Sequence, residues 1–310
     1  MEMLQGRDLP DIWMFVRVVE AASFSEAARR IGTTKAHASK AVARLEKTLA
    51  SKLLHRSTRK LGLTEAGQAI FQHALRMTED AQAIEALAAG MRAGPGGTLR
   101  VSASMAFGNT HLAGLLPDFL ERYPDIRVVL TMTDRYVDLV EEGIDVALRF
   151  ASRIDMQGAV ARSIAPLNYV LVAAPAYLEK HGIPAAIGDL HTHRCLSFGS
   201  TGAPAVWEFE TGGETVRVKV NGVMSANSSP SLRLAMLRGG GIALLPTYVV
   251  GEDIRRGEAV RLLPQAVPVG NFGDRMYAVY LENRFLPPKV RVFIDYLVER
   301  IGERPYWDDF

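Results

Sequence analysis

The sequence predicts an α/β protein of several domains: a small helical module, then one long helix, then two α/β lobes. Three observations support this fold class. Residues 29–60 contain ten Lys or Arg and one acid, Glu46, a net +9. Residues 65–91 contain no proline and repeat apolar residues every seven positions. After residue 97, segments typical of strands and of helices alternate. A length of 310 residues accommodates two or three such domains.

Three short helices are expected in the first module. The first follows Pro10, where apolar residues recur at i, i+3, i+4 and i+7: Ile12, Phe15, Val16 and Val19. Ser23, three residues before Glu26, makes a capping-box pattern that begins the second helix, and Gly32 ends it. Thr34 is a suitable N-cap for the third. The turn between the second and third helices therefore predicts a helix-turn-helix.

The third helix has two contrasting faces. The expected buried face carries Ala38, Val42, Leu45 and Leu49, and the opposite face carries Lys35, Lys40, Arg44 and Lys47. A basic stretch alone is equally consistent with a solvated surface. The one-sided distribution favours a surface that binds a polyanion, and the remainder of the chain, at −7, is mildly acidic because the whole chain is +2.

Two short strands are expected after the third helix, at Leu53–His55 and Leu61–Leu63. They flank the segment Arg56-Ser57-Thr58-Arg59-Lys60, so the pattern is that of a wing with a basic tip. We expect the winged helix-turn-helix domain to cover residues 1–64.

A long helix, capped by Thr64, is predicted over residues 65–92. Its apolar stripe consists of Ile70, Met77, Ile84 and Met91, with Ala74, Ala81 and Ala88 between them. This heptad indicates a linker helix that dimerises, although the stripe would also suit packing on its own domain. At about 1.5 Å per residue the helix would span roughly 40 Å. The segment AGPGG at 93–97 predicts a hinge.

Residues 98–310 predict two α/β lobes. The expected strands cover 99–103, 128–131, 146–150, 169–173, 242–246 and 276–281, with a hairpin at 207–220 that turns at Gly212-Gly213. The expected helices cover 107–122, 135–142, 176–181, 230–238 and 288–301. The first three strands and first two helices of this series predict a βαβαβ unit with a parallel sheet.

Residues Phe15–Ala66 resemble the DNA-binding domain of LysR-type transcriptional regulators. The matching residues are Ser23-Phe24, Ala27-Ala28, Ser39, Leu45-Glu46, Leu53, Arg56, Arg59 and Leu63-Thr64-Glu65-Ala66-Gly67. A weaker similarity continues through Leu116-Pro117, Phe119, Tyr123-Pro124, Asp138-Leu139-Val140, Gly143, Asp145 and 241–246. Departures at Ala50 and Leu54 are changes of packing. Departures at Lys35 and His37 affect which DNA sequence is preferred.

The resemblance implies a transcriptional regulator with a two-lobe effector domain like a periplasmic binding protein. It implies as partners double-stranded DNA, a small-molecule effector, RNA polymerase and further copies of the chain, in a homodimer or homotetramer. In this family the chain crosses between the lobes twice, which suggests an effector domain at 98–310 with lobe I at about 98–162 and 268–302 and lobe II at about 163–267.

The N-terminal part of a recognition helix lies nearest the bases in a major groove. We therefore expect DNA contacts from the third helix at Thr34, Lys35, His37, Ser39 and Lys40. Arginines that meet phosphates are expected at Arg29, Arg30, Arg44, Arg56 and Arg59. For Arg44 the alternative is an ion pair with Glu46 or another acid.

The resemblance places the effector between the lobes. The residues that it indicates are Ser102, Ser104, Met105, Thr131, Thr133, Phe198, Ser200, Asn227 and Ser228. A helix N-terminus with polar residues nearby suits a small organic acid, because unpaired N–H groups and the helix dipole attract a carboxylate. The alternative is that these residues are simply caps and turns. Arg135 and Arg149 are further candidates in this region.

Other features favour structural roles. Cys195, the single cysteine, is expected to be a buried structural thiol, because no second cysteine would resolve an oxidised one. His191 and His193 lack further metal ligands nearby in the sequence. Gly239–Gly241 is not followed by the Lys-Ser/Thr of a phosphate loop, and we expect it to end a helix.

Two other classes of protein fit the sequence less well than a regulator. An enzyme would need a nucleophile–base set or a metal cluster, and no spacing supports one. We therefore expect no catalytic residues, no metal and no cofactor. A solute-binding protein of a transporter would need an export signal, and the segment MEMLQGRDLPDIWMF does not resemble one. Apolar runs such as 169–178 are too short for a membrane helix. A cytoplasmic location is expected.

Overall fold

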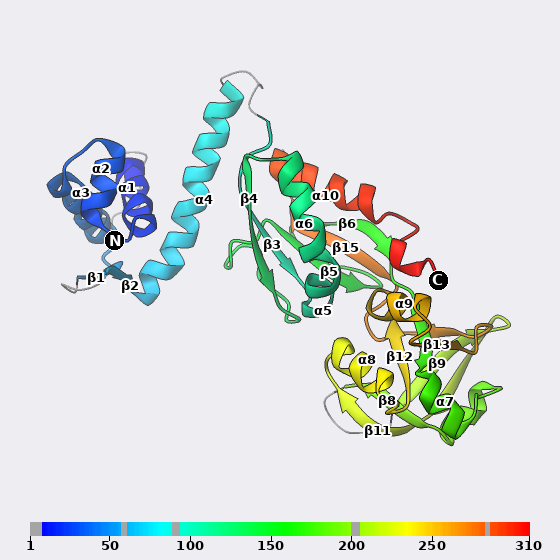
Figure 1. Cartoon of the computed structure of the whole chain (residues 1–310). Helices are drawn as coiled ribbons and strands as arrows, with labels where there is room; N and C mark the ends of the chain where they lie inside the picture. The colour runs from blue at the N-terminus through cyan, green and yellow to red at the C-terminus, as the bar shows by residue number, and fades with distance from the viewer. Residues whose placement is uncertain (1–7, 57–60, 89–93, 200–204, 283–285) are drawn as a thin grey trace. The chain divides into compact units, whose positions relative to one another are not determined.

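The computed structural model describes residues 8–56, 61–88, 94–199, 205–282 and 286–310 (Figure 1). The chain divides into two compact units. The first comprises residues 1–94 together with 138–143, and the second comprises residues 95–137 and 144–310. Each unit is described in turn.

The first unit contains the predicted helix-turn-helix, formed by α1 (Leu9–Glu20), α2 (Phe24–Ile31) and α3 (Lys35–Thr48). Both expected N-caps are confirmed: Ser23 Oγ accepts from the Glu26 amide, and Thr34 Oγ1 accepts from the His37 amide at 3.1 Å. Gly32 ends α2 with a φ of +76°, a left-handed conformation that glycine adopts at little cost.

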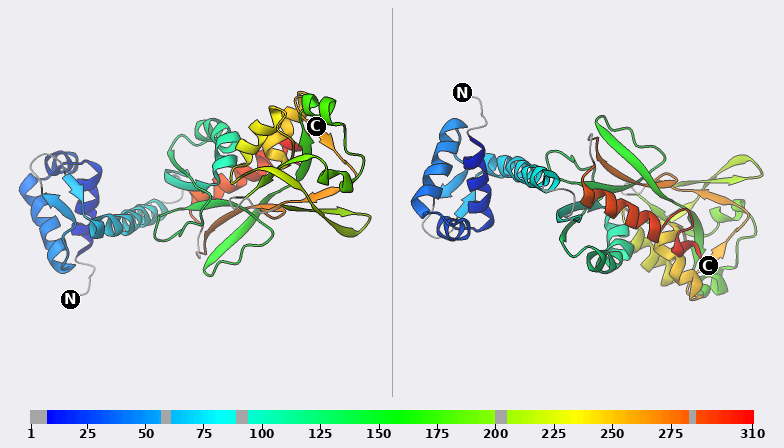
Figure 2. Two further views of the ribbon diagram at one scale, coloured as in Figure 1. Left: turned by 90° about the horizontal axis from the view of Figure 1, so that it is seen from below. Right: turned by 90° about the horizontal axis from the view of Figure 1, so that it is seen from above.

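The core of this unit lies between the helices. Phe15, Ala38 and Leu45 are buried, and Phe15 meets Phe71 edge-to-face at 6.2 Å. Both views of Figure 2 show α1, α2 and α3 gathered beside α4 (Glu65–Ala88). The predicted wing strands form an antiparallel pair, β1 (Leu54–Arg56) with β2 (Leu61–Leu63). The tip at 57–60 lies outside the described residues.

The apolar stripe on α4 lies in two different environments. Thr64 Oγ1 accepts from the Gly67 amide at 2.9 Å, as expected for its cap. Four residues of the first half pack against the helix-turn-helix core: Ile70, Phe71, Ala74 and Leu75. Met77, one heptad later than Ile70, is 43% exposed, and Ala81 is exposed. The first half therefore packs on its own domain, and the stripe emerges at Met77.

The second unit begins with lobe I, a five-stranded sheet in the order β4-β3-β5-β15-β6. Its strands are β3 (Gly97–Ala103), β4 (Ile126–Met132), β5 (Val146–Ala151), β6 (Ala159–Pro166) and β15 (Arg275–Leu281). The parallel strands of the predicted βαβαβ unit are confirmed, since β3 runs parallel to β4 and β5. Strand β15 is antiparallel to β5 and β6. Strand β6 extends beyond the expected lobe boundary at residue 162.

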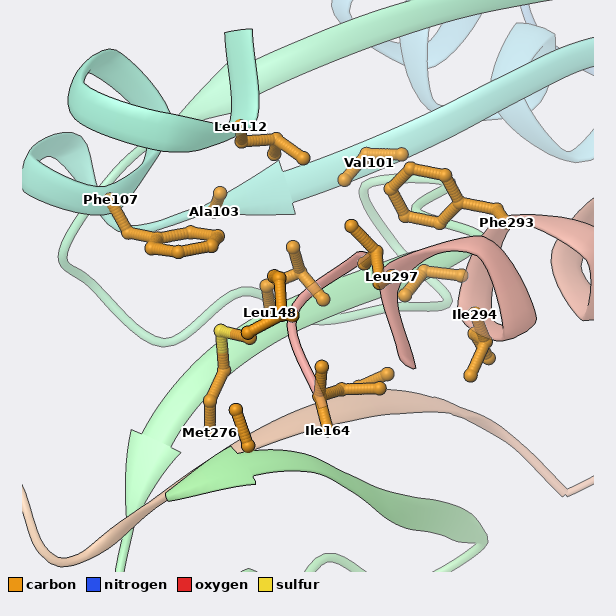
Figure 3. Packing of buried hydrophobic residues seen from close by; sticks show 14 of the residues in the cluster. Val101, Ala103, Phe107, Leu112, Leu148, Ile164, Met276, Phe293, Ile294 and Leu297 are labelled. Carbon is orange, nitrogen blue, oxygen red and sulfur yellow. The ribbon is translucent and has the colours of Figure 1, made fainter. Parts of the chain in front are cut away.

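Helices cover the lobe I sheet. A helical run consists of α5 (Met105–Phe107), a π-helical turn (Gly108–Leu112) and α6 (Ala113–Arg122), and α10 (Pro288–Arg300) packs beside it. Phe119 of α6 meets Phe293 of α10 edge-to-face at 5.3 Å, so both helices share one apolar layer. Figure 3 shows this core, with Phe293 and Leu297 pointing toward the side chains of the strands.

One predicted element of lobe I is wrong. Residues 135–142 form turns, and the expected helix is absent from this described segment. Asp138 Oδ1 accepts from the Val140 and Glu141 amides, each at 2.8 Å. Such a side-chain bond offers the backbone an alternative to helical pairing, and a single turn results.

Lobe II contains a second five-stranded sheet in the order β11-β8-β12-β7-β13. Its strands are β7 (Tyr169–Ala173), β8 (Arg194–Phe198), β11 (Asn221–Ala226), β12 (Ile242–Pro246) and β13 (Val260–Leu262). The predicted hairpin is present as β9 (Val206–Thr211) and β10 (Glu214–Lys219), with β14 (Val267–Val269) beside β9. The helices are α7 (Pro175–His181), α8 (Ser229–Leu237) and α9 (Thr247–Arg255). Short 3₁₀ turns cover Ile187–His191 and Tyr306–Asp308.

Helix α9 was not predicted. It begins directly after Pro246 with the sequence TYVVGEDIR, in which threonine, two valines and a glycine have low helix propensity. Tertiary packing stabilises it, because Tyr248, Val249 and Val250 are all buried.

Candidate nucleic-acid interface and effector site

The exposed side of α3 carries the residues expected to read DNA. Lys35, His37 and Lys40 are exposed, and Ser39 is half-buried. Thr34 is exposed too, but its hydroxyl is engaged in capping α3. The structure thus places the residues expected to contact DNA at the start of one helix. The N-terminus of α3, which is the positive end of the helix dipole, lies beside them.

Glu46 fixes the far end of α3 to the wing. Its side chain is buried, with Oε1 accepting from the Leu53 amide at 3.0 Å and Oε2 accepting from Lys52 Nζ at 2.8 Å. Burial alone would raise the pKa of Glu46. The hydrogen bonds from Lys52 and from the Leu53 and Leu54 amides outweigh it, and the pKa lies below its ordinary value. The ionised carboxylate of Glu46 therefore connects α3 to the start of β1.

Arg44 is held by a carboxylate of α1. Its Nε and Nη2 donate to the two oxygens of Asp11 at 2.8 and 2.5 Å. The Asp11 side chain is only 10% exposed, whereas that of Arg44 is 56% exposed. The alternative of an ion pair for Arg44 is thus confirmed, with Asp11 as the acid in place of Glu46. The pair joins α3 to α1.

Arg29 and Arg30 share one carboxylate on α2. Both donate to Glu26, with Arg29 Nη2 at 2.7 Å and Arg30 Nε at 2.8 Å from Oε1. The hydrogen bonds from Arg29 and then Arg30 lower the pKa of Glu26 to about 2. The cluster therefore keeps a net positive charge of one at neutral pH. Of the wing arginines, Arg56 ends β1 opposite Leu61, and Arg59 lies outside the described residues.

The effector residues expected in lobe I gather where β3 and β4 end. Ser102 is fully buried, and its Oγ accepts from Arg149 Nη2 at 2.8 Å. Ser104 precedes α5, whose first residue, Met105, is exposed. Thr131 lies in β4, is exposed and is the register partner of Ser102, and Thr133 follows directly after this strand. The structure therefore places these five residues within one end of the sheet.

A carboxylate of the chain itself already occupies the start of α5. The Met105 amide donates to Asp134 Oδ1 at 3.0 Å. Thr133 Oγ1 accepts from the Arg135 amide. These contacts agree with the alternative in which Ser, Thr and Asp side chains here act as caps and turns.

The effector residues of lobe II lie after β8 and before α8. Phe198 is half-buried and meets Phe272 edge-to-face at 4.7 Å. Ser228 is the N-cap of α8, where its Oγ accepts from the Ser231 amide at 3.3 Å, and Asn227 beside it is exposed. The predicted helix start is confirmed. Ser200 lies outside the described residues.

Sequence reasoning missed an aromatic pair near this region. Tyr248 of α9 is buried and stacks on Phe150 of β5, with ring centroids 5.0 Å apart and planes 7° apart. Burial, followed by the nearby Tyr169 and Asp134, raises the pKa of Tyr248, so its hydroxyl stays protonated. No local signal marks this pair, because the two residues are remote in sequence.

The remaining candidates have structural roles. Cys195 is fully buried, and burial raises its pKa to about 12, so it is no reactive thiol. His193 Nδ1 lies 3.1 Å from the Tyr177 hydroxyl. Across the described ranges, no group of three or more His, Cys, Asp and Glu side chains is placed to hold a metal ion. Gly239 and Gly240 donate to carbonyl groups of the last turn of α8, as expected for a helix end.

No helix among the described residues is long and apolar enough to span a lipid bilayer. A winged helix-turn-helix with a basic outer face, followed by a long helix and an α/β unit built on two five-stranded sheets, is typical of a DNA-binding protein with a separate regulatory domain.

Comparison with known proteins agrees with this class. The family described as "LysR substrate binding domain" matches residues 92–302, and "Bacterial regulatory helix-turn-helix protein, lysR family" matches residues 9–68. The probable HTH-type transcriptional regulator LtrA of Klebsiella pneumoniae is 35% identical over 293 residues, 94% of each chain.

Solved structures extend the similarity. CrgA of Neisseria meningitidis, a LysR-type regulator, has a TM-score of 0.61 and 34% identity, covering 97% of this chain and 100% of that one. The virulence activator AphB of Vibrio cholerae has a TM-score of 0.57 and 29% identity, covering 94% and 98%. The chain belongs to the LysR family: it is a LysR-type transcriptional regulator with a helix-turn-helix DNA-binding domain and an effector-binding domain.

Proposed function

We propose that this regulator reads double-stranded DNA with the first turns of α3 in a major groove and the wing beside it. Base edges are contacted by Lys35, His37, Ser39 and Lys40, near the cap at Thr34. Phosphates are contacted by Arg29, Arg30, Arg56 and Arg59. Arg44 acts differently: it positions α3 through Asp11. The observation that carries the proposal is the exposed basic face of α3 opposite its buried apolar face.

The effector is proposed to be a small organic acid bound between the two lobes. Its expected contacts are Ser102, Ser104, Met105, Thr131, Thr133, Phe198, Ser200, Asn227 and Ser228. The N-terminus of α8, with Asn227 exposed beside it, supports a carboxylate there. At α5 the chain's own Asp134 takes this place, so α8 is the better anchor.

The assembly proposed is a homodimer through α4, which forms a homotetramer on DNA in the cytoplasm and contacts RNA polymerase. The exposed part of the α4 stripe, at Met77 and Ala81, supports the dimer. Effector binding shifts the population of lobe arrangements and so changes how the dimers bend DNA. No catalytic step, metal or cofactor enters this function.

The test is binding of the purified protein to DNA upstream of its own gene and neighbouring genes, at two salt concentrations. A specific protected site is expected, with affinity falling steeply as salt rises because bound lysines and arginines release counterions. Lys35→Ala should change the preferred sequence in a selection from randomised DNA, since it removes a groove-facing donor worth about 1–3 kcal/mol of discrimination.

Lys180→Ala, an exposed lysine of α7 in the other unit, is the matched control and should change neither property. Salt-independent retention on DNA, or an unchanged selected motif for Lys35→Ala, would contradict the proposal.

A further inference from the structure

The last residues of the chain return to the place where the two lobes join. After α10 of lobe I, the tail forms a 3₁₀ turn at Tyr306–Asp308 that lies against α9 (Figure 1). The contact is tight: a Cβ on Gly251 of α9 would lie 2.0 Å from the carbonyl oxygen of Trp307. Trp307 itself is buried. Any side chain at residue 251 would therefore displace the tail.

Helix α9 belongs to both lobes. Its first turn contributes Tyr248 and Val249 to the lobe I core, together with Trp307. The next residue, Val250, belongs to a lobe II core that includes Leu232 of α8. A movement of lobe II relative to lobe I must therefore withdraw the first turn of α9 from one core or from the other.

A second tie joins α9 to lobe II. The guanidinium of Arg233 on α8 donates to both oxygens of the buried Asp253 on α9. Because Ser228 is the N-cap of α8, this ion pair connects the proposed carboxylate anchor to α9.

Polar contacts fasten the tail to both sides of the junction. The Tyr306 hydroxyl lies 2.6 Å from His111 Nδ1, and His111 Nε2 lies 2.7 Å from the Tyr248 carbonyl oxygen. A carbonyl only accepts, so Nε2 carries the proton and Nδ1 accepts from Tyr306. His111 sits on the π-helical turn of lobe I, a feature that often marks functional positions.

The tail also reaches the strand crossing between the lobes. Asn168, which follows β6 of lobe I and precedes β7 of lobe II, donates from Nδ2 to Asp308 Oδ2 at 2.7 Å. Its carbonyl oxygen accepts from the Thr247 amide, the first residue of α9, at 2.9 Å. Hydrogen bonds thus connect the tail to the crossing at Asn168, and the crossing to the start of α9.

We propose that residues 305–310 are a latch that holds the first turn of α9 in the lobe I core and so limits movement between the lobes. The latch must loosen whenever the lobes change their arrangement. Its regulatory meaning rests on the proposed effector response, whereas its mechanical role does not.

The test compares three variants of the full chain by hydrogen exchange without effector: Gly251→Ala, Tyr306→Phe and truncation after Arg304. The first forces the tail off α9, the second removes one hydroxyl, and the third removes the latch. Exchange at Tyr248–Gly251 and at 105–112 should rise by roughly ten-fold or more for Gly251→Ala and the truncation, and by less for Tyr306→Phe. Strands β8 and β12 should keep their protection.

Tyr136→Phe, which removes a hydroxyl from a tyrosine that is 74% exposed, is the matched control and should change nothing. Unchanged exchange in α9, or an increase spread evenly over both sheets, overturns the latch. DNA binding measured in parallel separates the two proposals, because loss of the latch leaves the first unit intact. If the protein binds no DNA but the variants still show the local increase in exchange, the latch proposal stands and the proposed function is wrong.

Discussion

At the residue scale, Arg44 shows how a basic residue on a recognition helix acquires a structural role. The sequence places it on the basic face beside Lys40 and Lys47. In the folded chain two of its nitrogens bind Asp11 on α1, 33 residues away. This ion pair supports a positioning role for Arg44, because a guanidinium that already binds a carboxylate holds two helices together and is less available to a phosphate.

Asp11→Asn tests this assignment. We expect weaker DNA binding together with a loss of about 1 kcal/mol of stability, a modest figure because the Arg44 side of the pair is solvated. Urea unfolding and DNA titration measure the two effects. Glu20→Gln, which removes the carboxylate of the Arg17–Glu20 pair, is the control and should cost less, because Glu20 is 39% exposed and Asp11 only 10%. Unchanged or tighter DNA binding for Asp11→Asn would mean that Arg44 acts mainly as a phosphate contact.

His111 predicts a pH dependence. Burial lowers its pKa below the ordinary value, outweighing the raising effects of the Tyr248 carbonyl and the nearby Glu252. At pH well above 6.5 the ring is neutral in both folded and unfolded chains. As the pH falls through about 6.5, the unfolded chain binds the proton first, so the folded state loses stability until the pH passes the lower folded pKa.

The measurement is the free energy of unfolding of the protein and of His111→Gln between pH 8 and 5, an interval of about three units centred on the ordinary histidine value. The difference between the two should shrink as the pH falls, because glutamine does not titrate. Other buried histidines, such as His193, are present in both proteins and cancel. A difference that is constant with pH would show that His111 titrates alike in both states.

At the element scale, the two halves of α4 differ in what surrounds their apolar stripe. Ile70 and Ala74 complete the helix-turn-helix core, and Met77 continues the same stripe into solvent. A stripe that leaves its own core can pack on another apolar surface, and in the proposed homodimer a second α4 with the same heptad would provide it.

Met77→Glu should therefore weaken the dimer, raising its dissociation constant by roughly ten-fold or more, since a charge would be buried in the helix pair. Sedimentation equilibrium measures this. Gln68→Glu, at an exposed position nine residues earlier and so on the opposite side of the helix from Met77, should leave the dimer intact. Equal association of both variants would place the dimer contact elsewhere.

Elements differ in how well their sequence predicts them. The caps at Ser23, Thr34 and Thr64 were found because a cap depends only on residues three positions away. The prediction of a helix at 135–142 is wrong because the Asp138 side chain accepts hydrogen bonds from nearby backbone amides. Apolar periodicity carries no information about such a bond. Helix α9 was missed because burial in two cores overrides its weak propensity.

At the scale of the whole molecule, charge is divided between the parts. The segment 29–60 carries +9, and the remainder carries −7. We expect such a division to orient the protein on DNA, since the basic module is attracted to phosphates and the acidic remainder is repelled. This part of the function was visible in the sequence, because formal charge does not depend on the fold.

The sequence by itself determined the basic recognition helix, the wing strands, the heptad and the parallel strands of lobe I. All of these depend on near neighbours or on simple periodicity. Tertiary structure alone decided the contacts between remote residues: Asp11 with Arg44, and His111 with Tyr306, 195 residues apart. It also decided the order of strands in each sheet and the membership of α9 in two cores. The physical reason is that such contacts form between surfaces the folded chain brings together, and local sequence carries no record of the partner.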